Sequence, residues 1–140
     1  MTCHALIPCA GVGARAGAGM PKQYLLAAGR PLVAHALDAI EAVPRIGTVL
    51  VVLAADDRQF DALVPPRDGR VVARVGGSTR AASVRAGLRV LRERGAADGD
   101  WVLVHDAARC LLQPALVERL LDACLDDKVG GLLALPLADT

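Results

Sequence analysis

The sequence predicts a single α/β domain, residues 1–140, built on a mostly parallel β-sheet with helices on both faces. Short apolar runs alternate with segments of helical periodicity along the chain, and this alternation is typical of βαβ units. Apolar residues make up 54% of the 140 residues but aromatic residues only 2%, so alanine, valine and leucine must supply most of the core. A chain of this length is long enough to bury one such core.

The first half of the chain predicts two strands and two helices. Ala5–Cys9 is a brief apolar run that leads into a glycine-rich loop. Leu32–Val43 repeats apolar residues at helical spacing, which predicts a helix. Gly47–Ala54 is almost continuously apolar and rich in valine, as in a strand buried on both faces. Arg58–Leu63 is expected to form a short helix that ends before a proline pair.

The second half continues the alternation. Arg70–Val75 is expected to be a third strand, and Arg80–Arg94 has the apolar spacing of an amphipathic helix. Trp101–His105 predicts a fourth strand, Pro114–Asp127 a helix and Gly131–Pro136 a fifth strand. In parallel sheets, ligands bind beyond the carboxyl ends of the strands. We therefore expect the loops that follow the first, third and fourth strands to line one edge of the sheet.

The loop after the first strand has the composition of an anion site. It carries glycines at four positions, together with Arg15 and Lys22. These glycines are Gly11, Gly13, Gly17 and Gly19. Glycine allows close approach of a ligand to the main chain, and successive amides in such a loop can form an anion-binding nest. The loop therefore predicts binding of several phosphates. An ordinary surface loop is the alternative, but such loops seldom follow a buried strand while also carrying an arginine and a lysine.

Two better-known phosphate loops fit this segment poorly. Residues 11–16 formally match the dinucleotide pattern G-x-G-x-x-A. In that fold a helix begins inside the motif, whereas Gly17, Gly19 and Pro21 would interrupt it here. The acidic residue expected about 20 residues later is absent as well. A Walker A loop is excluded because no Gly-Lys-Ser/Thr follows. The pattern leaves an open loop that can wrap a triphosphate.

Two further loops carry polar residues directly after strands. Asp106 lies one residue beyond the fourth strand, where a carboxylate beside a phosphate loop could bind Mg²⁺ or cap the next turn. Arg109 could hold a phosphate or pair with a surface acid, and His105 is favoured as a packed, hydrogen-bonded residue. The segment G-G-S-T-R-A-A-S, residues 76–83, offers close backbone approach to a base and hydroxyls of which one can cap a helix. Arg80 is either a functional positive charge at the edge of the sheet or only a solvated residue at the start of the helix.

Bulk charge and cysteine content exclude several classes of function. Sixteen basic residues against 15 acidic ones give a net charge of +1, which offers no general attraction to nucleic acid or to a membrane surface. No apolar run approaches the length needed to span a membrane. The four cysteines have no metal-ligand spacing. We therefore expect a cytoplasmic protein with reduced thiols and no nucleic-acid or membrane partner.

Taken together, these segments resemble one family. The motifs are P-C-A-G-V-G-A-R with P-K-Q-Y, then G-G-S-T-R-A-A-S-V-R-A-G-L, V-H-D-A-A-R and A-L-P-L-A-D-T. In this order and spacing they are similar to 2-C-methyl-D-erythritol 4-phosphate cytidylyltransferase, the CTP-dependent enzyme of the non-mevalonate isoprenoid pathway. The resemblance covers the whole chain. It implies a Rossmann-like nucleotidyltransferase fold, Mg²⁺ as cofactor, and a homodimer in the full-length protein.

The resemblance implies a role for each matching residue. Cytosine and ribose would be recognised by Pro8, Cys9, Ala10, Gly77, Ser78 and Ser83. The triphosphate would be held by Gly11, Gly13, Arg15 and Lys22, of which Arg15 and Lys22 are catalytic. Asp106 would bind Mg²⁺. The sugar-alcohol phosphate would be faced by Ala107, Arg109 and Thr140.

The resemblance also sets the competing hypotheses. Family members continue well beyond residue 140. The chain is therefore expected to correspond to the N-terminal, nucleotide-binding part of the enzyme, without the family's C-terminal part. A ribitol-5-phosphate cytidylyltransferase would bind CTP with loops of the same kind, although the A-A-R after Asp106 favours the methylerythritol enzyme. A nucleotide-binding fragment without turnover is the third hypothesis. Cys9 stands where the family usually has alanine, a mild departure if only its backbone is used.

Overall fold

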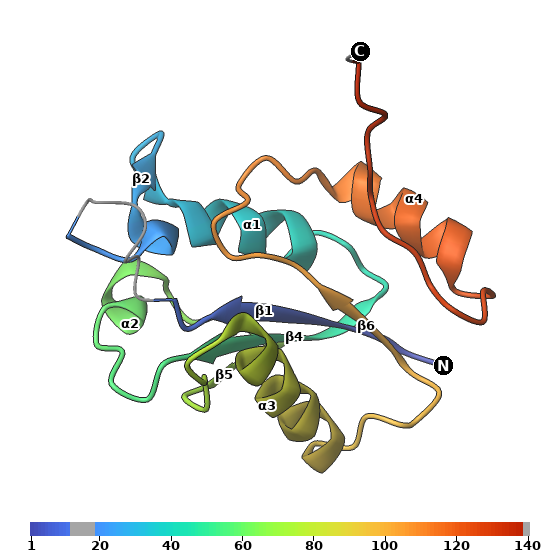
Figure 1. The fold of residues 1–140 in the computed structure, drawn as a ribbon, viewed down its shortest axis with the longest axis horizontal. Coiled ribbons are helices and arrows are strands. Elements are labelled where there is room, and N and C mark those ends of the chain that lie inside the picture. Colours follow the sequence, from blue (N-terminus) through green and yellow to red (C-terminus); the bar gives the residue numbers. More distant parts are fainter. Residues whose placement is uncertain (12–18, 139–140) are drawn as a thin grey trace.

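A computed structural model of the chain describes residues 1–11 and 19–138. Within these residues, four parallel strands form one sheet in the order β5-β4-β1-β6 (Figure 1). The strands are β1 (Cys3–Cys9), β4 (Ile46–Leu53), β5 (Arg70–Ala73) and β6 (Trp101–Val104). The α/β architecture and the mostly parallel sheet predicted from the sequence are confirmed.

Helices cover both faces of this sheet, as predicted (Figure 1). On one face, α1 (Leu32–Glu41) contributes Val33, Leu37 and Ile40 to a core shared with the odd-numbered side chains of β1 and β4. On the same face, α4 (Pro114–Cys124) packs Val117 and Leu121 beside the start of β1 and β6. Short apolar residues allow both helices to lie close to the strands.

The opposite face is covered by α3 (Arg80–Glu93). Its Leu91 packs with Leu6, Leu50 and Val52, the side chains that alternate to this face. Gly87 sets how closely α3 approaches, because a β-carbon there would come within 2.6 Å of Leu6 and 2.8 Å of Val52. The alternation of neighbouring residues between two cores explains why β1 and β4 are almost continuously apolar.

Short elements lie around the carboxyl edge of the sheet. A 3₁₀ turn, η1 (Lys22–Tyr24), precedes a small antiparallel hairpin of β2 (Leu26–Ala27) and β3 (Arg30–Pro31). Ala28 and Gly29, between them, both have positive φ, as a tight two-residue hairpin turn requires. The sequence does not indicate this hairpin, because alanine stands where asparagine or aspartate usually marks such turns. The short helix α2 (Phe60–Leu63) follows β4.

The predicted fifth strand at residues 131–136 is wrong. In the described structure, residues 129–138 have no regular secondary structure and run beside α4 before leaving the body of the molecule (Figure 1). A strand needs a neighbour for its backbone hydrogen bonds, and the sheet of described residues ends at β6. Leu135, which lies within the predicted strand, is 91% exposed.

The other predicted elements exist, with ends that differ by up to three residues. The helix that starts at Pro114 ends at Cys124 rather than Asp127. The strand that starts at Arg70 ends at Ala73 rather than Val75, since Gly76 already bonds across to β4. Among the described residues, no helix is both long and apolar enough to cross a membrane.

The core on the α1 face leads to the first prediction. Leu37 is fully buried between α1 and the central strands, so Leu37→Ala leaves a cavity and should lower the free energy of unfolding by about 2–5 kcal/mol. Urea denaturation followed by circular dichroism measures this change. The matched control is Leu26→Ala, at a residue that is 67% exposed, which should change stability by no more than about 0.5 kcal/mol. Equal effects of the two substitutions would contradict this placement of the core.

Candidate active site

The loops that follow β1, β5 and β6 meet at the carboxyl edge of the sheet, as the sequence predicts. After β5, the chain crosses the end of β4, where the amide of Gly76 donates to the carbonyl of Leu53 at 2.8 Å. A β-carbon at Gly76 would collide with Ala10, which directly follows β1. Glycine is therefore required for the two loops to touch. On the other side of β1, Val104 pairs with Leu6, so Asp106 lies near the end of β1.

Ser83 organises the loop after β5. It is 2% exposed. Its Oγ accepts a hydrogen bond from the amide of Gly77 at 3.1 Å and donates to the carbonyl of the same residue at 3.5 Å. Thr79 caps α3, since its Oγ1 accepts from the amide of Ala82 at 3.0 Å. The hydroxyl that caps the helix is thus that of Thr79, whereas Ser78 is exposed beside Gly77.

Gln23 closes the base of the glycine loop. This buried side chain donates from Nε2 to the carbonyl of Cys9 at 3.2 Å and to that of Gly11 at 2.9 Å. It therefore joins the end of β1 to η1, the turn that begins with the exposed Lys22. Sequence reasoning missed Gln23 because nothing local distinguishes a glutamine that bonds its own loop from one in solvent. The only signal was its position directly after Lys22.

A second buried group braces the same turn. The hydroxyl of Tyr24 donates to Oδ2 of Asp57 at 2.5 Å, and Oδ1 of Asp57 accepts from the amides of Gln59 and Phe60. Burial raises the pKa of Tyr24, and the neighbouring Cys9 and Asp57 raise it further. Tyr24 therefore stays a neutral donor, which ties η1 to the start of α2.

Cys9 lies in this environment with its side chain turned into the core. It is 2% exposed. Burial raises the pKa of its thiol to about 12; the contact with Tyr24 lowers this pKa in part, and the nearby Asp57 raises it by a smaller amount. Only the backbone of Cys9 can therefore face a ligand. The side chain at this position therefore belongs to the core and not to the loop.

Asp106 accepts hydrogen bonds from two arginines. Nε of Arg80 donates to Oδ1 at 2.7 Å, and Nε of Arg109 donates to Oδ2 at 2.8 Å. Burial alone would raise the pKa of Asp106, but the two guanidinium groups outweigh it and hold the pKa below its ordinary value. The three side chains carry one net positive charge at the edge of the sheet. Arg80, which the sequence left open, thus belongs to this charged cluster.

The donor set at Asp106 fits a Mg²⁺ ion that arrives with a nucleotide. A carboxylate can accept at about four positions, and the two arginines use one on each oxygen. Among the described residues, no group of three or more histidine, cysteine or acidic side chains could hold a metal by itself. Mg²⁺ sites in nucleotide enzymes need only one or two carboxylates, because phosphates and water supply the remaining ligands.

His105 and Ala107 flank Asp106, and the contacts of both side chains serve the fold. Nε2 of His105 lies 2.9 Å from the carbonyl of Arg109, which makes His105 the hydrogen-bonded residue at a strand end that the sequence favoured. The side chain of Ala107 is buried in the core beneath α1. Ala107 can therefore present only its backbone to a ligand.

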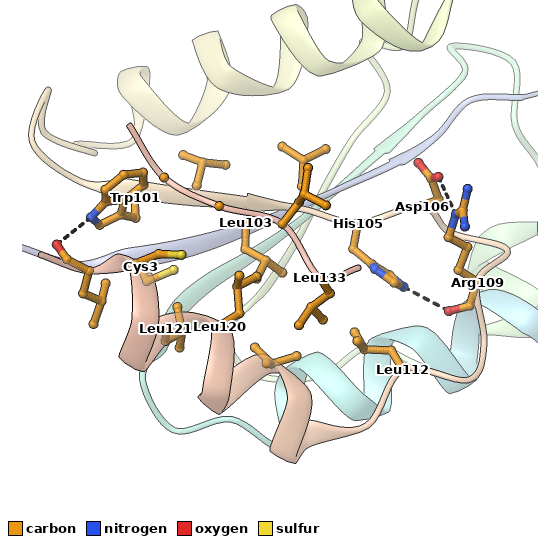
Figure 2. Close-up of a pocket in the computed structure, with 18 of the residues that line it drawn as sticks. Cys3, Trp101, Leu103, His105, Asp106, Arg109, Leu112, Leu120, Leu121 and Leu133 are labelled. Atoms are coloured by element: carbon orange, nitrogen blue, oxygen red, sulfur yellow. Dashed lines mark hydrogen bonds and ion pairs between the residues drawn. The ribbon is translucent and has the colours of Figure 1, made fainter. Parts of the chain in front are cut away.

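A groove of about 1100 Å³ runs from this cluster along β6 and α4 (Figure 2). Apolar side chains, among them several leucines and Trp101, line most of it, and Asp106 and Arg109 lie at one end. Phosphates need charged or hydrogen-bonding partners, so the apolar length of the groove does not suit a nucleotide. The polar end, with Arg80, Asp106 and Arg109, offers such partners.

Three of the predicted site residues, Gly13, Arg15 and Thr140, lie outside the described residues. Those that the structure describes are distributed over the three loops at one edge of the sheet. Pro8 and Cys9 end β1, Ala10 and Gly11 follow them, and Lys22 begins η1. Gly77 and Ser78 lie in the loop after β5, with Ser83 in the first turns of α3, and Asp106, Ala107 and Arg109 lie in the loop after β6.

Comparison with known proteins identifies the family. The family model described as 2-C-methyl-D-erythritol 4-phosphate cytidylyltransferase matches residues 3–140. The chain belongs to this family. A crystal structure of a 4-diphosphocytidyl-2C-methyl-D-erythritol synthase superposes with a TM-score of 0.87 at 36% identity, covering 99% of this chain and 62% of that one. The 2-C-methyl-D-erythritol 4-phosphate cytidylyltransferase of Francisella tularensis superposes with a TM-score of 0.69 at 29% identity, covering 88% and 52%.

Curated relatives are more similar in sequence and considerably longer. The bifunctional enzyme IspD/IspF of Albidiferax ferrireducens is 60% identical over 99% of this chain, which spans 33% of that protein. The 2-C-methyl-D-erythritol 4-phosphate cytidylyltransferase of Laribacter hongkongensis is 59% identical over 99% of the chain, which spans 59% of it. The chain therefore corresponds to one third to three fifths of these members of the cytidylyltransferase family.

The two hydrogen bonds that Gln23 donates to the carbonyls of Cys9 and Gly11 yield a prediction about stability. Gln23→Leu keeps the volume but removes the donor, so the carbonyls of Cys9 and Gly11 lose their buried partner. We expect the free energy of unfolding to fall by about 1–3 kcal/mol in urea denaturation. The same change at the exposed Gln113 should shift it by no more than about 0.5 kcal/mol. A Gln23→Leu protein as stable as wild type would show that these two hydrogen bonds contribute nothing to the free energy of unfolding.

The burial of Cys9 yields a prediction about pH. With a pKa of about 12, only about one Cys9 thiol in ten thousand is ionised at pH 8, and thiolate is the reactive form. Alkylation of native protein at pH 8, followed by mass spectrometry, should modify Cys9 far more slowly than the partly exposed Cys110. The rate at Cys9 should rise as the pH rises toward 12. In denaturant the two cysteines should react alike, and equal rates in the native protein would contradict the assignment.

Proposed function

We propose that this chain forms the CTP-binding part of an enzyme that transfers a cytidylyl group from CTP to 2-C-methyl-D-erythritol 4-phosphate and releases pyrophosphate. Membership of the cytidylyltransferase family supports this proposal. The structural observation that carries it is the meeting of three loops at the end of β1, where Gly76 touches Ala10 and Arg80 pairs with Asp106. The loops bring backbone amides, hydroxyls and charges to one small region.

The nucleotide base is proposed to bind between the loops after β1 and β5. Buried Ser83 holds the amide and carbonyl of Gly77 in place, so Gly77 and the exposed Ser78 can present fixed polar groups to cytosine. Across from them, the backbone of Pro8, Cys9 and Ala10 lines the end of β1. A loop that is rigid before the ligand arrives pays less ordering entropy on binding.

The triphosphate is proposed to lie along the glycine loop. Gly11, Gly13, Arg15 and Lys22 supply amides and positive charges there, and Gln23 holds Lys22 near the start of the loop by bonding to Gly11. Asp106 would hold Mg²⁺ carried by the nucleotide, and the ion would neutralise charge on the phosphates. Arg109, together with the backbone of Ala107 and with Thr140, would bind the phosphate of the acceptor.

The proposed chemistry is an in-line displacement. An oxygen of the acceptor phosphate forms a bond to the α-phosphorus of CTP, while the bond from that phosphorus to the bridging oxygen breaks and pyrophosphate leaves. A phosphate monoester is already anionic, so no general base is needed. Catalysis then consists of positioning the two reactants and stabilising charge with Arg15 and Lys22.

The surroundings of the protein belong to the same proposal. Its four cysteines are free thiols, as a reducing cytoplasm favours. A net charge of +1 supports small-molecule substrates rather than nucleic acid. Family resemblance supports a homodimer for the full-length protein.

Pyrophosphate release tests the function. We expect release from CTP and Mg²⁺ when 2-C-methyl-D-erythritol 4-phosphate is added, and much slower release with ribitol 5-phosphate. Release with ribitol 5-phosphate alone would identify a different cytidylyltransferase. Binding of CTP in calorimetry without release for either acceptor would support a nucleotide-binding fragment, and absence of both would overturn the proposal.

Replacement of Lys22 tests its role in the transition state. Lys22→Ala should lower turnover at saturating CTP by about 10²-fold or more, because a charge that stabilises the leaving pyrophosphate is lost. The dissociation constant for CTP should change far less. Lys128, an exposed lysine after α4, provides the matched control, and Lys128→Ala should leave both quantities unchanged. A Lys22→Ala protein that binds CTP weakly yet turns over normally at saturation would contradict this role.

A further inference from the structure

The ion pair between Arg80 and Asp106 connects two loops that are remote in the sequence. Arg80 is the first residue of α3, and its partner lies 26 residues away, after β6. The helix α3 packs over β1 and β4, while β6 lies on the other side of β1 from β4. The ion pair therefore reaches across the line of β1, at the edge where the glycine loop begins.

Helix stability does not account for an arginine at this position. The first turn of a helix carries a partial positive charge, so a cation there is unfavourable. Thr79 already caps the helix. The side chains of Arg80 and Asp106 are 59% and 34% exposed, and ion pairs this close to solvent contribute little to folding. What the contact does is fix the direction of the Asp106 carboxylate.

We propose that Arg80 is a positioning residue for cytidylyl transfer, acting through Asp106; this inference rests on the function proposed above. Asp106 is held from two sides, by Arg80 at Oδ1 and by Arg109 at Oδ2. Arg80 projects from a capped helix of 14 residues. Arg109 lies in the loop itself, and its side chain is 76% exposed. Arg80 is thus the fixed partner and Arg109 the one able to turn toward a phosphate.

This arrangement separates two tasks. When Arg109 leaves Asp106 to bind the acceptor phosphate, Arg80 keeps the carboxylate in its place. The same contact joins the start of α3, whose Ser83 bonds Gly77 of the loop after β5, to the loop after β6. Loss of Arg80 should therefore disturb the alignment of the two reactants more than the binding of either one.

The first arm of the test uses the free 140-residue protein and needs no substrate. Nitrogen-15 NMR follows the exchange with water of the Nε–H groups of Arg80 and Arg109. In Arg80→Met, Arg109 becomes the only partner of the carboxylate and the neighbouring positive charge is gone, so the hydrogen bond from Arg109 should strengthen and exchange there should become slower by about twofold to fivefold. The matched control is Arg85→Met, an exposed arginine on the same helix outside the cluster. It should leave exchange at Arg109 unchanged.

The second arm measures pyrophosphate release and CTP binding. Arg80→Met should reduce turnover at saturating CTP and 2-C-methyl-D-erythritol 4-phosphate by about 10- to 100-fold, with the dissociation constant for CTP changed by less than about threefold. Arg80→Lys keeps a cation that can donate to Oδ1, so it should restore a large part of the lost turnover. Arg85→Met should behave like wild type in both measurements.

The outcomes separate the two proposals. Equal turnover in Arg80→Met and wild type, or equal loss in Arg80→Met and Arg85→Met, would overturn the role of Arg80 while leaving the transferase proposal intact. Weakened CTP binding with normal turnover at saturation would also overturn it, because that pattern belongs to a binding residue. A wild-type protein that neither binds CTP nor releases pyrophosphate would overturn the proposed function. The exchange measurement would then still decide whether Arg80 holds Asp106.

Discussion

The parallel pairing of β1 with a strand on each side is the interaction on which the rest of the structure depends. β1 pairs with β4 from Cys3 to Cys9 and with β6 from Cys3 to Leu6. Because all these strands point the same way, their carboxyl ends fall at one edge, and each following loop begins there. Residues as distant in sequence as Ala10, Gly76 and Asp106 become neighbours for this reason. The apolar side chains that alternate above and below β1 are buried against helices on both faces, so the position of this edge is firmly set.

Side-chain contacts to the backbone, rather than regular structure, then shape the loops at this edge. Gln23 ties η1 to the end of β1, Ser83 holds Gly77, and Asp57 joins Tyr24 to the start of α2. Gln23, Ser83 and Tyr24 are buried, and a buried polar group without a partner would cost more than the bond contributes. The buried groups thus fix the loop geometry, while Lys22, Ser78 and Arg109 are exposed, where a ligand can reach them.

Charge is distributed unevenly over the molecule. The chain as a whole has a net charge of +1, yet Arg80, Asp106 and Arg109 by themselves carry one net positive charge at the end of β6. The apolar groove that continues along α4 has a different chemistry (Figure 2). The charged end of the groove would therefore attract a phosphate, whereas the apolar part along α4 would not. This agrees with the distribution of polar residues over the three loops.

The sequence by itself determined the α/β class, the order along the chain of the four strands of the main sheet and of helices α1 to α4, and which loops carry the polar residues. It could do so because periodicity and glycine content are local properties. The contacts of Gln23 and Arg80 could not be predicted, since their partners lie 12 to 26 residues away in the chain. The tertiary structure alone decided that Thr79 caps α3 while Ser83 supports Gly77, and that Cys9 faces the core. It also decided that residues 131–136 form no strand. An apolar run becomes a strand only where a neighbouring strand accepts its backbone hydrogen bonds, and composition carries no information about that neighbour.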